Sequence, residues 1–197
     1  MSNKQKTIKA AARLFHEQGF RDTSVDQITA ASNISKSNFY YHFKSKESLG
    51  YDVLDSWVEG FRDQMLGKIL MDEAVLPDQR IRNCFTALIN LVENRGGRYG
   101  CPFGNMALEL SDVHEGFRTR LAGFFDQWAE AVRSCLEQGK LEGIWSDELE
   151  SGKMGHFVIA AAEGAIMLTK THRRVNLLQE GLDLIFRLLE SYRYDLR

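Results

Sequence analysis

Helical spacing dominates the pattern of hydrophobic and polar positions, and no stretch alternates as a strand would. Apolar residues at positions 8, 11, 12 and 15 share one face of a first helix, which Gly19 should end. Ser24 and Gln27 form a capping box for a short second helix. Ser35 can cap a third helix after a turn at residues 32–33. The N-terminal part is therefore expected to hold three short helices.

The remaining pattern predicts longer helices. One should run from about Ser45 to Leu70 without a linker, and loop 95–104 should separate the helix after Pro77 from a short helix that ends near Leu110. The last three should cover about Glu115–Gln138, Asp147–Thr171 and Asn176–Tyr192, and Gly139 and Gly143 should break the pattern between the first two of these. We expect an all-α fold of about nine helices in two domains, 1–48 and 49–197, that share a continuous helix.

Composition favours a soluble globular protein, because 44% of the 197 residues are hydrophobic and 26% are charged. We expect no signal peptide and no membrane span, since the apolar run at 157–162 is too short. Three cysteines without paired spacing indicate the reducing cytoplasm. The net charge of −2 divides into +4 for residues 1–50 and −6 for the rest. A basic head on an acidic body suggests that the head binds nucleic acid.

Residues 23–49 contain the most informative motif. Two short helices joined by a tight turn form a helix-turn-helix, and the second is sized to enter the DNA major groove. Ile34, Phe39 and Phe43 should hold that helix inward, whereas its outward side chains are polar or aromatic: Lys36, Ser37, Asn38, Tyr41 and His42. A helical hairpin that only packs would not explain this exposed polar and aromatic face.

This segment resembles the DNA-binding domain of the TetR family of bacterial transcriptional regulators. The residues that carry the resemblance are Thr23, Ile28, Ala31, Ile34, Ser35, Tyr40, Phe43, Lys46 and Leu49. Asn33 and Ser37 stand where the family pattern has glycines, and asparagine tolerates the left-handed turn. The resemblance implies that Thr23 and Ser35 belong to the DNA-binding set and that mainly phosphates are contacted by Tyr40, Tyr41, His42 and Lys46. Base reading would fall to Lys36, Ser37 and Asn38.

Such a protein is expected to bind a two-fold operator as a homodimer. The last two helices are the best interface candidates, because small residues allow close approach and an apolar face supplies area. The expected interface residues are Ala161, Gly164, Ala165, Leu168, Leu178, Leu182, Ile185, Phe186 and Leu189. The alternative is that these faces form only the internal core.

The body is expected to bind a small-molecule effector. Aromatic and soft side chains are plentiful there and suit an apolar pocket. The candidate lining residues are Trp57, Phe61, Cys101, Phe103, Met106, Phe124, Phe125, Trp128, Phe157, Glu163 and Met167. Glu109 and His156 could, like Glu163, supply its polar groups. For any one of these residues, ordinary core packing is the simpler interpretation.

Cys101 is the sharpest local hypothesis. Pro102 suits the first position of a helix, which would make Cys101 the N-cap at the positive end of the helix dipole. Arg95 and Arg98 are close in sequence, and positive surroundings favour a reactive thiolate. The segment also resembles a loop of TetR-type regulators that respond to electrophiles or oxidants, which implies a sensor. Alternatively, Cys101 only caps or fills space, as Cys84 and Cys135 are expected to do.

We expect no metal site, no cofactor and no enzymatic activity, because no ligand spacing or nucleophile motif is present. The predicted function is a ligand- or redox-responsive repressor of a palindromic operator. An effector or a Cys101 adduct would shift the long helix near residues 48–54 and change the separation of the recognition helices. The alternatives are a small thiol-based redox enzyme or scavenger that uses Cys101 and a helical protein-interaction module.

Overall fold

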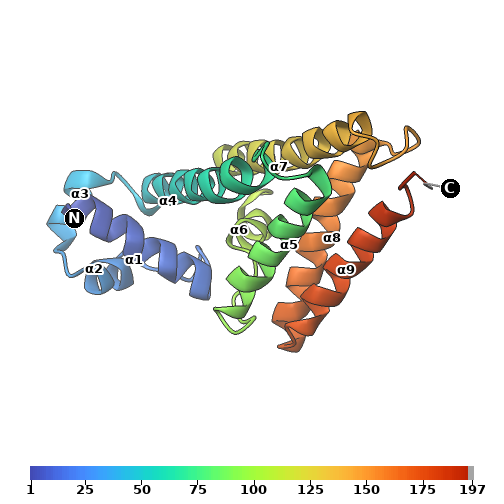
Figure 1. Ribbon diagram of the computed structural model, residues 1–197. Coiled ribbons are helices and arrows are strands. Elements are labelled where there is room, and N and C mark those ends of the chain that lie inside the picture. The colour runs from blue at the N-terminus through green and yellow to red at the C-terminus, as the bar shows by residue number, and fades with distance from the viewer. Residues whose placement is uncertain (195–197) are drawn as a thin grey trace. The chain divides into compact units, whose positions relative to one another are not determined.

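The computed structural model describes residues 1–194, which form two compact units (Figure 1). The first unit combines residues 1–60 with 101–121, and the second combines 61–100 with the chain from 122 onward. All regular elements of the described residues are helices, nine α and one π, so the expected all-α fold is confirmed. None of these helices is long and apolar enough to cross a membrane.

The first unit contains α1 (Asn3–Gln18), α2 (Val25–Ser32), α3 (Lys36–His42), α4 (Lys46–Phe61, whose last residue belongs to the second unit) and α6 (Pro102–Leu110). Both predicted caps are present: the Ser24 hydroxyl accepts a hydrogen bond from the Gln27 amide, and the Ser35 hydroxyl accepts one from the Asn38 amide. Helix α1 packs on α2, α3 and α6. The core between them is closed by Ile28, Phe39 and Leu49, which are fully buried.

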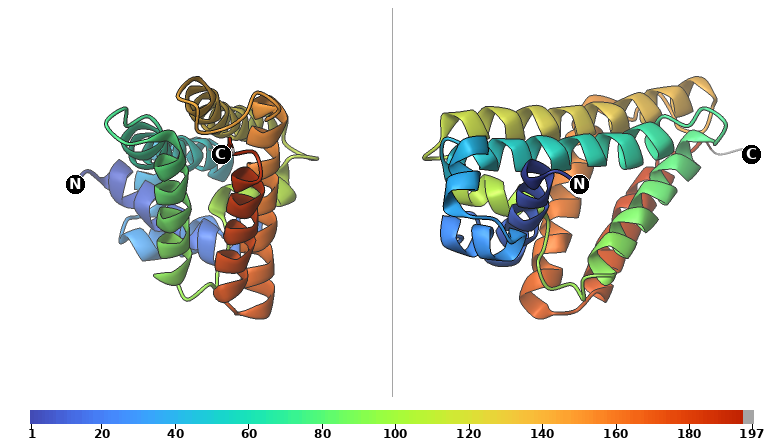
Figure 2. Two further views of the ribbon diagram at one scale, coloured as in Figure 1. Left: turned by 45° about the vertical axis from the view of Figure 1, so that its right-hand side comes forward. Right: turned by 90° about the vertical axis from the view of Figure 1, so that its left-hand side faces the viewer.

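The second unit contains the π-helix η1 (Arg62–Leu70), α5 (Pro77–Glu93), α8 (Ser151–His172) and α9 (Asn176–Glu190), together with most of α7 (Glu115–Leu141). Helix α9 packs along α8 and also contacts α5, which in turn packs on η1 (Figure 2). The predicted helix from Ser45 to Leu70 is therefore helical throughout, but its last nine residues are π-helical.

Gly139 does not break α7, contrary to the expectation. A Cβ at this position would lie 2.3 Å from the Trp145 ring, so glycine makes room for the fully buried indole without ending the helix. The chain leaves the helix at Gly143, whose φ of +73° is in the left-handed region. Residues 147–148 form a turn and residues 149–150 are not helical, so α8 begins at Ser151, four residues later than expected.

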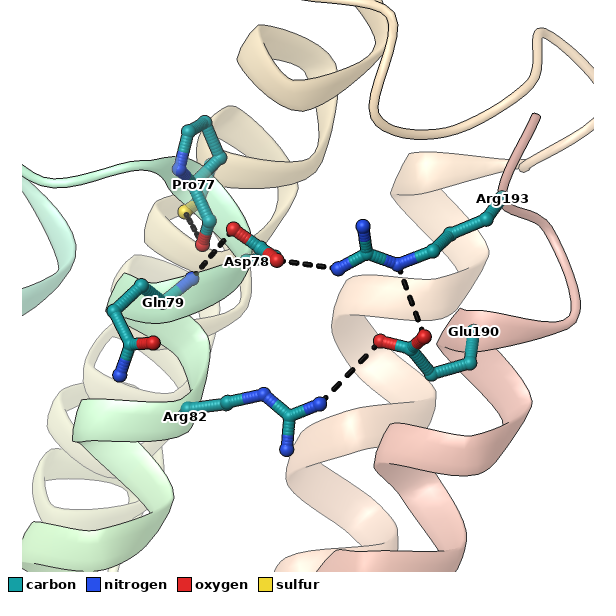
Figure 3. Close-up of polar contacts among 7 residues, drawn as sticks. Pro77, Asp78, Gln79, Arg82, Glu190 and Arg193 are labelled. Carbon is teal, nitrogen blue, oxygen red and sulfur yellow. Dashed lines mark hydrogen bonds and ion pairs between the residues drawn. The ribbon is translucent and has the colours of Figure 1, made fainter. Parts of the chain in front are cut away.

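A surface network joins the start of α5 to the end of α9. Arg193 pairs with Asp78 and with Glu190, and Glu190 also pairs with Arg82 at 3.4 Å (Figure 3). Beside it, the buried thiol of Cys135 donates to the carbonyl of Pro77 at 3.1 Å. These contacts fix the first turn of α5, although exposed ion pairs each add little to the free energy of unfolding.

Candidate DNA-binding face and its supporting contacts

The α2–α3 turn has the geometry of a helix-turn-helix. Asn33 is the C-cap of α2 with φ 53° and ψ 50°, so asparagine takes the left-handed conformation expected at this turn. Ser35 then caps α3, and its hydroxyl lies 2.9 Å from that of Ser37. Phe39 anchors α3 from within, since its side chain is fully buried.

The outward side of α3 presents polar and aromatic groups. Tyr41 is 82% exposed and Tyr40 56% exposed, which is unusual for aromatic side chains without a partner surface. Lys36 and Ser37 are exposed, while Asn38 and His42 are half-buried. The Oδ1 of Asn38 is buried and accepts no hydrogen bond, so its amide retains unused capacity.

Lys36 forms an ion pair with an acidic residue of the preceding helix. Its Nζ lies 2.6 Å from Oδ1 of Asp26 on α2, and this pairing raises the pKa of Lys36. Both side chains are exposed, so the pair can separate when a phosphate or base competes for the ammonium group. Asp26 was not among the residues expected at this face, although an acidic residue within a basic N-terminal segment is a visible signal.

Lys46 does not have the phosphate-contacting geometry expected from the sequence. Its Nζ donates to the carbonyls of Phe20, Arg21 and Thr23 at 2.8, 3.3 and 2.9 Å, and it lies 4.5 Å from the centre of the Phe20 ring. Burial lowers the pKa of Lys46, and the charge of Glu109 partly offsets that shift. Because an ammonium group has three donors, all are used inside the protein, and we assign Lys46 a structural role.

Thr23 also requires correction. Its side chain is fully buried and its hydroxyl donates to the carbonyl of Gly19 at 2.6 Å. The same hydroxyl accepts from the Gln18 amide at 3.2 Å. A side chain enclosed in this way shapes the α1–α2 loop and has no surface to offer to DNA.

Glu109, suggested as a polar group of an effector pocket, also binds this loop. Its Oε2 accepts from the backbone amide of Phe20 at 2.9 Å, and its Oε1 accepts from that of Arg21. The two partners are almost ninety residues apart in the chain, so no local sequence signal could have revealed the contact. The carboxylate is therefore occupied by the protein itself.

The candidate pocket residues divide between the two units. In the first, Phe103 and Met106 are buried on α6, and the Phe103 ring lies 6.1 Å from that of Trp57. In the second, Phe61 lies 5.1 Å from Phe124 and 4.8 Å from Trp128, and Phe125 adjoins Phe124. Each set forms an aromatic cluster of its own unit.

Two pocket candidates on α8 are in the wrong place for an interior wall. Phe157 is 48% exposed and Met167 53% exposed, so both lie on the outer surface of the chain. Glu163 is half-buried on the same helix, and the side chain of His156 bonds to the backbone one turn before it. Phe157 and Met167 are apolar, as a pocket lining would be, but their positions on the helix place them on its exposed face.

Cys101 is the N-cap of α6, and Pro102 is at its first position, as predicted. The Sγ accepts a hydrogen bond from the Gly104 amide at 3.5 Å, and the side chain is half-buried. Cys84 and Cys135 are buried, and burial raises the pKa of each thiol to about 12. The expectation that these two are core residues is confirmed.

The expected dimer surface on α9 must be revised. The five residues selected there are buried within the chain, where they pack in its own core: Leu178, Leu182, Ile185, Phe186 and Leu189. On α8, Ala165 is also buried, whereas Ala161 and Gly164 are half-buried and Leu168 is exposed. A partner can therefore reach only part of the predicted set.

Both α8 and α9 carry a second apolar stripe, which faces outward. On α9 it consists of Leu177, Leu184 and Leu188, and on α8 of Phe157, Ala160, Ala161, Gly164 and Leu168. Spacings of three, four and seven residues place the members of each stripe on one helical face. A Cβ at Gly164 would meet no atom within 4 Å, so this side of α8 is open.

Comparison with known proteins identifies both parts of the chain. Residues 8–50 match the bacterial regulatory proteins of the tetR family, and residues 77–185 match the tetracyclin repressor-like C-terminal domain. The chain belongs to the TetR family. This TetR-family chain is 31% identical to the HTH-type transcriptional repressor DhaR of Mycobacterium sp. strain GP1, over 94% of this chain and 91% of that protein. It is 25% identical to the transcriptional regulator AcuR of Cereibacter sphaeroides, over 86% and 77%.

Solved TetR-family structures share the fold. A TetR regulatory protein from Rhodobacter sphaeroides superposes with a TM-score of 0.86 at 23% identity, covering 93% of this chain and 96% of that one. The reduced form of E. coli NemR gives 0.81 at 18% identity, covering 93% and 95%. The family match shows that α2 and α3 are the helix-turn-helix of a DNA-binding transcriptional regulator. No comparison favours the thiol-enzyme alternative over this assignment.

Proposed function

We propose that this TetR-family protein is a cytoplasmic homodimeric repressor that leaves a palindromic operator when a small molecule binds to its C-terminal domain. The exposed face of α3 carries the proposal, because the side chains of Tyr40 and Tyr41 are more than half exposed there, beside the exposed Lys36 and Ser37. The name of DhaR, a transcriptional repressor, supports the direction of regulation. On this proposal residues 1–48 bind DNA and the rest of the chain binds the effector and the second subunit.

Selection of bound duplexes from a random pool at near-physiological salt tests the DNA-binding part. We expect enrichment of a palindrome whose half-site centres are about 34 Å apart or a multiple of it. Asn38→Ala should then change the preferred bases, while Tyr41→Phe should weaken binding to all sequences. If a folded wild-type protein enriches no sequence, the repressor proposal fails and a protein-interaction role gains support.

We propose that two copies dimerise through the outward stripes of α8 and α9. The stripes offer large exposed apolar side chains beside small residues, a combination that lets helices of two subunits pack closely. Leu184→Glu should convert the dimer to a monomer in light-scattering measurements and abolish operator binding. Leu108→Glu is the control, because it makes the same change at an exposed leucine on α6 and should leave the dimer intact. A dimer that survives Leu184→Glu would place the interface elsewhere.

We propose an apolar effector for the aromatic cluster of the second unit and a modifiable thiol at Cys101. The N-cap position supports the thiol proposal, because free amides of a helix terminus favour a thiolate. For an activated alkene, the Cys101 thiolate would attack the electrophilic carbon, so that the C–S bond forms as the carbon–carbon π bond breaks. The adjacent carbon then takes up a proton from solvent, which replaces the one lost by the thiol. Release of operator by an electrophile in the wild type but not in Cys101→Ser would support it, and equal release from both would refute it. Turnover of a thiol reductant is not expected.

A further inference from the structure

Two side chains of opposite charge hold the α1–α2 loop. Lys46, from the start of α4, binds three of its carbonyls, and Glu109, from the end of α6, binds two of its amides. Bonds of this kind involve a full charge and are about twice as strong as neutral ones. The loop that leads directly into the helix-turn-helix is thus fixed to α4 and α6 through its backbone.

Close approach of the carboxylate depends on Gly19. Its φ is +95°, and a Cβ there would lie 3.3 Å from Oε2 of Glu109. Glycine therefore permits both the backbone conformation and the short distance between loop and carboxylate. Gly19 therefore has a second role besides the helix end expected from its position in the sequence.

We propose that Glu109 is a positioning residue for operator binding, which sets the direction in which α2 and α3 leave α1 with respect to α6. The inference rests on the proposed dimeric repressor. Only Ser24 separates the loop from α2, and α3 follows three residues after α2. A change in the direction of the loop therefore reorients the recognition helix as a rigid extension.

The consequence differs between one half-site and a palindrome. A single DNA-binding domain can bind a half-site whatever its orientation relative to α6. The two DNA-binding domains of a dimer must instead enter two major grooves at a fixed separation. Loss of the Glu109 bonds should weaken binding to the palindrome and leave half-site binding unchanged. A role limited to keeping the head folded would weaken both equally.

The experiment uses Glu109→Gln in the full-length protein and measures affinity for the selected palindrome, for a duplex with one half-site, and for random duplex. We expect palindrome affinity to fall by about tenfold, in line with loss of one charge-assisted hydrogen bond. Half-site and random-duplex affinities should change by less than about twofold. Glu109→Asp, which keeps the charge but shortens the reach, should behave in the same way and serves if the first variant melts early.

Asp112→Asn is the matched control, since Asp112 is exposed just beyond α6 and loses the same charge. Removing a negative charge should by itself strengthen DNA binding slightly, so the expected loss at Glu109 has the opposite sign. The inference is overturned if Glu109→Gln follows the control, or if all three affinities fall together with the melting temperature. A wild-type protein that selects no palindrome would instead refute the proposed function.

Discussion

The Nζ of Lys36 lies 2.6 Å from the carboxylate of Asp26, which ties the first residue of the recognition helix to the helix before it. This contact places a negative charge beside a lysine expected to read bases. DNA that approaches this helix must therefore compete with Asp26 for the ammonium group of Lys36.

Asp26→Asn should tighten binding to all DNA by a few-fold, roughly threefold to tenfold at low salt, because it frees Lys36 and removes a repulsive charge. The gain should shrink as salt increases. Titration of a labelled duplex at several salt concentrations measures it. In a Lys36→Ala background the part of the gain that acts through Lys36 should disappear, and an undiminished gain would mean that Asp26 acts by repulsion alone.

Lys46→Met should lower the free energy of unfolding by about 1–3 kcal/mol, because three loop carbonyls lose their charged donor. The slope of affinity against salt concentration should stay unchanged, since no phosphate contact is removed. Urea denaturation and salt titration together check both points. A slope that falls by about one with unchanged stability would restore the phosphate role first expected for Lys46.

Gly50→Ala should lower the free energy of unfolding by about 1–3 kcal/mol through overpacking. The new methyl carbon would lie 2.7 Å from the Phe20 ring and 2.8 Å from the Phe117 ring. Gly60→Ala, in the same helix, is the control, because a Cβ there meets nothing within 4 Å. Helix propensity predicts that this control gains about 0.5–1 kcal/mol. Equal effects in urea denaturation would contradict the packing of α4.

The three thiols should differ in accessibility. At pH 8 a colorimetric thiol reagent should label Cys101 rapidly and should reach Cys84 and Cys135 only after unfolding, since both are buried with a pKa of about 12. Cys101→Ser should abolish the rapid phase. A rapid phase that persists in this variant would mean that a buried thiol is accessible.

These two pKa values also determine a pH dependence. Each thiol has a raised pKa in the folded state, so its contribution to stability is complete below the ordinary value of 9.0 and is lost as the pH rises toward about 12. Unfolding by urea should therefore become easier above pH 9, and Cys84→Ala with Cys135→Ala should reduce that alkaline loss. An unchanged pH dependence in the double variant would assign it to other groups.

Local signals in the sequence predicted local structure well. The capping pairs at Ser24 and Ser35, and Pro102 after Cys101, fixed the starts of three helices because each acts within one helical turn. The π-helical end after α4 escaped prediction, since hydrophobic spacing over nine residues does not separate α from π geometry.

Contacts distant in sequence were not predictable. From the sequence, Lys46 was expected to contact phosphate and Glu109 to serve an effector pocket, because no local signal shows that the fold brings both to the same loop. On α9, hydrophobic residues occupy two adjacent stripes, and the pattern alone did not show which one faces inward. Leu182 proved to be core and Leu184 surface.

The hydrogen bonds that Lys46 and Glu109 make to the loop between α1 and α2 all involve main-chain atoms of the loop. Every amino acid other than proline presents the same amide and carbonyl groups, so the identity of the exposed Arg21 matters little to these bonds, whereas the charge of Asp22 also acts on Lys46. Mutations at Arg21 can therefore accumulate over evolutionary time while the geometry of the DNA-binding domain is inherited intact.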